Sequence, residues 1–240
     1  MTMNTRFVSC TFLIAAFGAL LLLARPAPAT AQALWVEGKH YEVVRPAVPT
    51  STPGKIEVVE VFSYGCPGCW QAEPWVTKLA ASLPATAQMV YIHASFNASE
   101  AWPMFQRAFV TAQSLGIAAK NHTAMFEAIW STGELPLVDM ATQRLRKPSP
   151  TIADAARFYA RRSNVKEADF IKASQSFDVD TKVRRSDELV RVYAVPSTPT
   201  IVVNGKYRLG PTTAGGYEQM IKLVNYLVAL ESQQNKRSGS

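Results

Sequence analysis

The sequence predicts an α/β fold in which one mixed β-sheet with flanking helices is interrupted by an inserted helical subdomain. A strand, a helix and a second strand follow one another before residue 97, helical periodicity alone fills residues 98–193, and two strands and a helix return after residue 194. The chain has 240 residues, 48% of them hydrophobic, which suits one sizeable core carrying an insertion and excludes two large independent domains.

The N-terminus has the pattern of a cleaved secretory signal. An apolar run at 7–23 leads into a Pro- and Ala-rich exit, where Ala29 and Ala31 have the small-x-small spacing of a cleavage site. A permanent membrane anchor is the alternative, because an apolar run of this length could just span a bilayer. The exit and the cleavage site favour removal of residues 1–31 and export to the periplasm, with a mature start near Gln32.

Export places the cysteines in an oxidising compartment. Cys10 lies inside the signal, and the apolar run follows it instead of preceding it, which is the wrong order for a lipoprotein anchor. The mature chain therefore has a single pair, Cys66 and Cys69.

The net charge of +7 is modest, and two of these charges belong to arginines of the signal. The remaining Lys and Arg residues form only short clusters, such as 144–147 and 161–162, which are typical of solvated helix faces. No nucleic-acid partner is expected, because such a partner needs a basic face or run.

The first half of the sheet is expected before the insertion. Residues 40–44 have strand character and lead into a Pro-, Thr- and Ser-rich turn, and the run IEVVEVFS at 56–63 is typical of a buried strand. A helix is predicted at 66–83, where Pro67 suits the first turn and Pro74 predicts a kink. A second short strand at 89–93 completes a βαβ unit with a right-handed crossover.

The insertion is expected to be helical throughout, without strands, and its aromatic and methionine side chains are expected mainly in a core. The sheet then resumes with a strand at 200–203, a hairpin turn at Asn204 and Gly205, and a strand at 206–209. A last helix is predicted at 216–230. The resulting units are 32–97 with 194–232 for the sheet domain, 98–193 for the insertion, and 233–240 for a flexible tail.

The pair in Cys66-Pro67-Gly68-Cys69 stands at the start of the helix predicted at 66–83. Disulfide exchange needs a thiolate, and the unpaired N–H groups and dipole of a helix N-terminus stabilise an anion placed there. Cys66 is therefore predicted to be the nucleophile. Cys69, three residues on and on the same helix face, is predicted to resolve a mixed disulfide formed at Cys66.

The pair could also be a zinc half-site, a structural disulfide or two inert cysteines. A zinc site would need two more ligands, and His40, His93 and His122 do not have the spacing of a zinc finger, so no metal is expected. A structural disulfide across so small a loop would stabilise little. Two inert buried cysteines stay possible, but an exported chain whose only pair is C-x-x-C after a strand favours redox function.

Two stretches, VVEVFSYGCPGCWQAEPWV and VPSTPTIVVNGKYRL, resemble the DsbA family of periplasmic dithiol oxidases. The resemblance implies a thioredoxin-like sheet domain and no cofactor other than the redox-active disulfide between Cys66 and Cys69. It also implies a monomer that acts on unfolded or reduced exported proteins and is reoxidised by a membrane oxidase of the DsbB type.

The resemblance also assigns residues around the pair. Thr198 and Pro199 match the family's cis-proline position, which lies against the cysteines and offers backbone groups to an extended substrate. Glu60 matches a buried acidic residue that shuttles protons to or from Cys69 and should have a raised pKa. The alternative for Glu60 is a strand-edge charge facing solvent, and the alternation of its strand does not decide between them.

One residue departs from the family pattern. Its best-known members have histidine where this chain has Gly68, so we expect a less stabilised Cys66 thiolate and a weaker oxidant. An isomerase or reductase of the DsbC or DsbG sort is the rival enzyme, but residues 32–54 leave no room for the dimerisation domain of those proteins. A non-catalytic peptide-binding chaperone is the rival from a different class.

Overall fold

The computed structural model describes residues 1–2, 35–139, 141–142 and 144–238. Apart from Met1 and Thr2, the predicted signal at 1–31 lies outside the described residues. None of the described helices is both long and apolar enough to cross a membrane. The sheet and all the described helices belong to the unit Trp35–Ser240.

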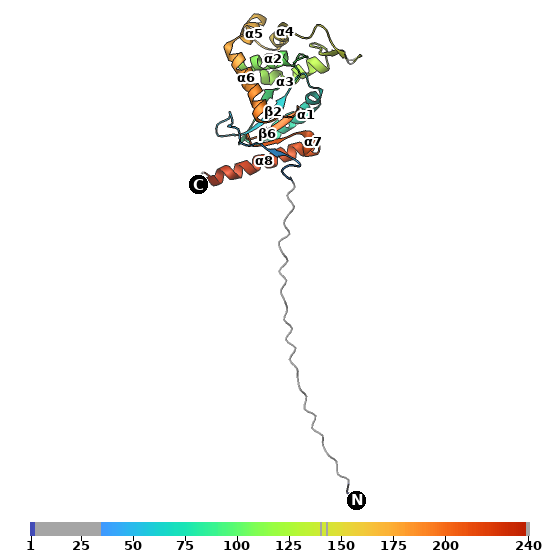
Figure 1. The fold of residues 1–240 in the computed structure, drawn as a ribbon, viewed down its shortest axis with the longest axis vertical. Coiled ribbons are helices and arrows are strands. Elements are labelled where there is room, and N and C mark those ends of the chain that lie inside the picture. The colour runs from blue at the N-terminus through green and yellow to red at the C-terminus, as the bar shows by residue number, and fades with distance from the viewer. Residues whose placement is uncertain (3–34, 140, 143, 239–240) are drawn as a thin grey trace. The chain divides into compact units, whose positions relative to one another are not determined.

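A five-stranded mixed sheet in the order β1-β7-β6-β2-β3 is built from both halves of the chain, as predicted. Figure 1 marks β2 from the first half and β6 from the second, which pair with each other. β2 is parallel to β3 and antiparallel to β6, and all seven of its residues are buried. The strands are β1 (Glu42–Val43), β2 (Ile56–Phe62), β3 (Ala87–His93), β6 (Thr200–Val203) and β7 (Tyr207–Leu209).

The turn between β6 and β7 is the predicted Asn-Gly hairpin. Asn204 and Gly205 both have positive φ, 51° and 65°, the backbone of a two-residue turn that matches the twist of the strands. A Cβ at Gly205 would lie 2.0 Å from the carbonyl oxygen of Val48. Only glycine therefore fits this turn against the loop that follows β1.

Helices cover both faces of the sheet. α1 (Pro67–Ser82) and α8 (Tyr217–Ser238) pack on one face, where Leu79 and Leu223 meet Val58 of β2 in one apolar cluster. On the other face, Leu189 near the end of α6 (Phe177–Val192) and the buried Tyr193 pack with Val59 in a second cluster. The sheet is thus the middle layer. Helix α1 continues past Pro74 to Ser82.

The last helix extends beyond the predicted 216–230, and residues 233–238 of the predicted flexible tail are helical. Just beyond the predicted end, Glu231 is fully buried and accepts hydrogen bonds from Asn204 (2.5 Å), Lys206 (2.6 Å) and Tyr207 (3.0 Å). These bonds hold this turn of α8 against the β6–β7 hairpin. A short helix that was not predicted, α7 (Pro211–Ala214), precedes α8.

The insertion is mainly helical, as its periodicity predicted, and the structure describes five helices in it. They are α2 (Trp102–Ser114), α3 (Ala118–Trp130), α4 (Ile152–Arg162), α5 (Glu167–Ser174) and α6. The expectation of no strands there is wrong, because β4 (Val138–Asp139) and β5 (Arg144–Leu145) form a small antiparallel pair. Two residues a side are too few to produce an alternating pattern in the sequence.

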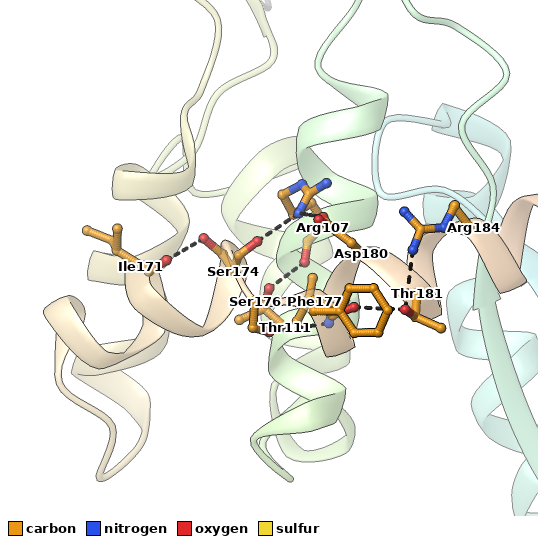
Figure 2. Close-up of polar contacts among 10 residues, drawn as sticks. Arg107, Thr111, Ile171, Ser174, Ser176, Phe177, Asp180, Thr181 and Arg184 are labelled. Carbon is orange, nitrogen blue, oxygen red and sulfur yellow. Dashed lines mark hydrogen bonds and ion pairs between the residues drawn. The ribbon is translucent and has the colours of Figure 1, made fainter.

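A polar contact between helices organises the insertion (Figure 2). Arg107 of α2 donates to the carbonyl oxygen of Ser174 at the end of α5 (2.8 Å) and to the Asp180 carboxylate in the first turn of α6 (2.7 Å). One guanidinium therefore joins three helices, and Phe105, Phe109 and Phe126 fill the core beside them.

Candidate functional site

The cysteine motif lies where β2 leads into α1. Cys66 is the N-cap residue of α1, with extended backbone, and Pro67 occupies the first turn. That turn contains no acidic residue, so no carboxylate competes for the exposed N–H groups. Cys66 is 9% exposed and Cys69 is fully buried, and both are free thiols in the structure.

The two thiols have opposite acidities. The pKa of Cys66 is lowered to about 6, chiefly by the hydrogen bond with the Cys69 thiol, while burial opposes the shift and hydrogen bonds with Thr198 and the backbone N–H groups of Gly68 and Cys69 assist it. The pKa of Cys69 is raised well above its usual value, first by burial and then by its hydrogen bond with Cys66 and the charges of Cys66 and Glu60. The more accessible thiol, Cys66, is therefore the more acidic one.

The loop before β6 meets the motif from the far half of the chain. The peptide bond between Thr198 and Pro199 is cis, as the resemblance implied. The carbonyl oxygen of Thr198 lies 3.5 Å from Cys66 Sγ, although the two residues are 132 positions apart. Thr198 and Pro199 also border Gly68, where an added Cβ would lie 3.8 Å from each of them.

Glu60 is buried beneath the motif. It stands on β2 between Tyr91 of β3 and Ile201 of β6, is 2% exposed, and one of its carboxylate oxygens has no hydrogen-bond partner among the described residues. Burial raises its pKa to about 8, and the charges of Glu73 and Cys66 add to the shift. The alternative of a solvent-facing strand-edge charge is excluded.

A second buried carboxylate was not predicted. Glu73 lies on the inner face of α1, where Thr77 (3.2 Å) and Thr123 of α3 (2.5 Å) donate to it. The available signal was its position four residues after Cys69, which places it on the same face of the helix. A charged residue on an amphipathic helix more commonly faces solvent, and its neighbour Thr123 comes from the insertion.

Tyr64, also missed, connects the motif to the insertion. Its backbone N–H donates to Nε2 of His93 (3.0 Å), its hydroxyl lies 3.0 Å from Nδ1 of His122, and its carbonyl oxygen accepts from Trp130 (2.8 Å). Burial lowers the pKa of His93 to about 3 and that of His122 to about 4, so both imidazoles are neutral. Within the described part of the chain, no group of three or more His, Cys, Asp or Glu residues is placed to hold a metal ion.

An aromatic pair lies beside the motif on the sheet domain. Trp75 of α1 and Tyr217 of α8 stack with ring centroids 5.8 Å apart and planes 8° from parallel, and Lys78 lies over the Trp75 ring. Burial raises the pKa of Tyr217, and the charges of Cys69 and Cys66 add to this shift.

Comparison with known proteins agrees with this arrangement. A family model described as thioredoxin matches residues 51–223. The thiol:disulfide interchange protein DsbA of Pseudomonas syringae pv. tomato is 37% identical over 194 residues, covering 81% of this chain and 83% of its own. The DsbA of Pseudomonas aeruginosa is 35% identical over 203 residues, covering 85% and 89%.

Solved structures give the same result. The crystal structure of Pseudomonas aeruginosa DsbA matches with a TM-score of 0.71 at 35% identity, over 84% of this chain and 97% of its own. The oxidoreductase DsbA from Xylella fastidiosa matches with a TM-score of 0.73 at 29% identity, over 83% and 99%. The thioredoxin-like fold with a helical insertion is thus established, and the chain belongs to the DsbA family of thiol:disulfide oxidoreductases.

Proposed function

We propose that the protein is a monomeric, exported dithiol oxidase that introduces disulfide bonds into reduced proteins of the periplasm. The disulfide between Cys66 and Cys69 is its only redox group, and no metal or organic cofactor takes part. The observation that carries the proposal is the unequal acidity of the two thiols, with the pKa of Cys66 at about 6 and that of Cys69 raised. An acidic Cys66 favours the dithiol form, which makes the disulfide a ready electron acceptor.

The reaction runs in two exchanges. A substrate thiolate attacks Cys66 Sγ, a bond forms between these sulfurs, the bond from Cys66 to Cys69 breaks, and its electron pair stays on Cys69. A second substrate thiolate then attacks the substrate sulfur of the mixed disulfide, and Cys66 leaves as a thiolate. The substrate gains a disulfide and the protein is reduced by two electrons.

Glu60 supplies the proton that Cys69 needs as it leaves. A carboxyl group with a pKa of about 8 is largely protonated near neutral pH, and its charge is felt at Cys69, so the two groups are coupled. After the exchange Glu60 carries the negative charge until solvent reprotonates it.

Thr198 and Pro199 hold the substrate. The Thr198 carbonyl oxygen lies 3.5 Å from Cys66 Sγ. An extended chain whose cysteine reaches this sulfur therefore passes Thr198 and pairs with its backbone as an added strand would. Pro67 begins α1 and Gly68 keeps the approach to Cys66 open, because it presents no side chain to the incoming sulfur.

The signal at 1–31 delivers the chain to the periplasm, where a membrane oxidase of the DsbB type takes the two electrons and restores the disulfide. In this scheme, the protein passes electrons from its reduced substrates to the membrane oxidase. A reductase or isomerase of the same fold would have a more negative reduction potential than this oxidase.

Two measurements test the proposal. We expect a reduction potential less negative than about −180 mV, the value typical of protein disulfide isomerase. We also expect oxidative refolding of reduced ribonuclease, with loss of that activity in Cys66→Ser. A potential near that of thioredoxin, about −270 mV, would identify a reductase. Refolding that survives Cys66→Ser would point to a chaperone instead.

A further inference from the structure

A cavity of about 200 Å³ is lined in part by the loop whose Thr198 carbonyl oxygen contacts Cys66 Sγ. Its walls come from the start of β1, the loop at 196–199, β7 and α7. Thr198 and Pro199 form one wall, so the cavity shares with Cys66 the loop whose carbonyl oxygen lies 3.5 Å from Cys66 Sγ. None of the roles proposed above uses this cavity.

The residues that line the cavity carry a net positive charge. Of the described residues that line it, Lys39 and Arg208 are basic and Glu42 is acidic. Glu42 is the cross-strand partner of Arg208, so their charges offset one another. The Lys39 side chain is exposed and forms no ion pair with any of the residues that the structure describes.

Arg208 is held in place. Its guanidinium donates to the carbonyl oxygens of Tyr193 (2.9 Å) and Ala194, and these bonds fix its position. Three residues with hydroxyl groups, Ser197, Thr212 and Thr213, also line the cavity. Hydroxyls and ammonium groups around a small space suit a carboxylate, which accepts hydrogen bonds only.

The cavity is smaller than the roughly 300–1,000 Å³ of typical sites for drug-sized ligands, so one side chain fits it better than a separate small molecule. An extended substrate lying along Thr198 presents alternate side chains to one side at about 3.3 Å per residue. A side chain within a few positions of the reacting cysteine therefore reaches the cavity.

We propose that this cavity is a substrate subsite that accepts an acidic side chain near the reacting cysteine, with Lys39 as its specificity-determining residue. The inference rests on the proposed function, because it requires the substrate to pass Thr198 while it reacts with Cys66. It adds a sequence preference to a reaction that the cysteine pair alone would carry out on any thiol.

Cysteine peptides that differ in one flanking residue test it. Each peptide carries Glu, Gln or Lys at one position up to three residues before or after its cysteine, and the rate constant for reducing the oxidised protein is measured by stopped flow. At one position we expect the Glu peptide to react about 5-fold faster than the Lys peptide, with a ratio that falls as salt is added.

Lys39→Glu, and separately Thr212→Asp at another lining residue, should abolish or invert this ratio. Lys120→Glu makes the same charge change as the first variant on an exposed site of α3 and should keep the wild-type ratio. Because the ratio compares two peptides on one protein, a general loss of activity in a variant does not alter it.

A ratio near one at every position, or an unchanged ratio in Lys39→Glu, overturns the subsite and leaves the proposed function standing. If no peptide of any charge reduces the oxidised protein, the proposed function is overturned, and the subsite with it.

Discussion

Cys66 and Cys69 are three residues apart on one helix end, yet their environments push their acidities in opposite directions. Cys66 is the N-cap residue and receives hydrogen bonds, whereas Cys69 is buried above Glu60. The sequence predicts this order from the helix N-terminus alone. It does not predict that the largest cause is the hydrogen bond between the two thiols.

Gly68 has room for a larger residue. An added Cβ would lie 3.6 Å from Cys66 Sγ, which is ordinary contact. We expect Gly68→His to lower the pKa of Cys66 below its value of about 6 and to make the disulfide more oxidising, because an imidazolium would stabilise the thiolate.

The pH dependence of the ultraviolet thiolate absorbance measures this pKa. Gly68→Ala is the control, since it adds the Cβ without the charge. The idea that Gly68 weakens the oxidant fails if the wild-type pKa is already as low as that of Gly68→His.

Glu60 carries a stability cost that depends on pH. Its pKa is about 8 in the folded protein against an ordinary 4.5, so folding favours its protonated form. The cost is absent below about pH 4.5, grows as the pH rises, and is complete above about pH 8.

We therefore expect Glu60→Gln to raise the free energy of unfolding by about 2 kcal/mol near pH 8 and by much less near pH 4.5. Denaturant unfolding at several pH values measures this difference. The same variant should slow reduction of the disulfide, because Gln cannot give Cys69 a proton. A gain in stability that does not vary with pH would contradict the buried, titrating carboxyl.

At the scale of elements, the β6–β7 hairpin depends on a glycine that contacts another segment. Gly205 has φ of 65°, and its missing Cβ leaves space for the Val48 carbonyl oxygen. Gly205→Ala should lower the free energy of unfolding by about 3 kcal/mol, combining backbone strain with a 2.0 Å clash.

Gly54→Ala is the matched control, because Gly54 also has positive φ but nothing lies within 4 Å of its added Cβ. Its cost should be about 1 kcal/mol. Urea unfolding of the two variants at one pH compares them, and equal losses would show that strain alone matters at Gly205.

The elements with a strong local pattern were predictable, and those set by distant contacts were not. β2 and the five helices of the insertion follow from hydrophobic periodicity. Glu231 of α8 bonds to a hairpin some 25 residues earlier, and no local sequence pattern predicts this contact. Alternation could not place Glu60, because β2 is buried on both faces.

At the scale of the whole molecule, the oxidation state is coupled to folding. The Cys66 thiolate exists only in the dithiol form, where its lowered pKa adds stability that is complete above about pH 9 and lost as the pH falls through about 6. We expect the dithiol form to be more stable near pH 7 by about 1 kcal/mol, allowing for solvent screening at this partly exposed group.

Thermal unfolding of the two forms should then differ by about 2–4 °C near neutral pH, and the difference should shrink below about pH 6. Cys66→Ser, which cannot form the thiolate, supplies the reference for unfolding without it. A disulfide form that melts above the dithiol form near neutral pH would contradict the proposed direction of electron flow.

Thr198 follows Cys66 by 132 residues in the chain. This separation determines which part of the site emerges first. A chain that crosses a membrane N-terminus first presents its two thiols before Thr198 has emerged. Until β6 docks beside β2, the pair lacks the loop that we propose binds the substrate, and it lacks the Thr198 hydrogen bond that helps to lower the pKa of Cys66. If the chain is exported as proposed, it emerges as an ordinary dithiol. The pair acts as an oxidant only after the last strands have docked and the proposed membrane oxidase has removed two electrons from it.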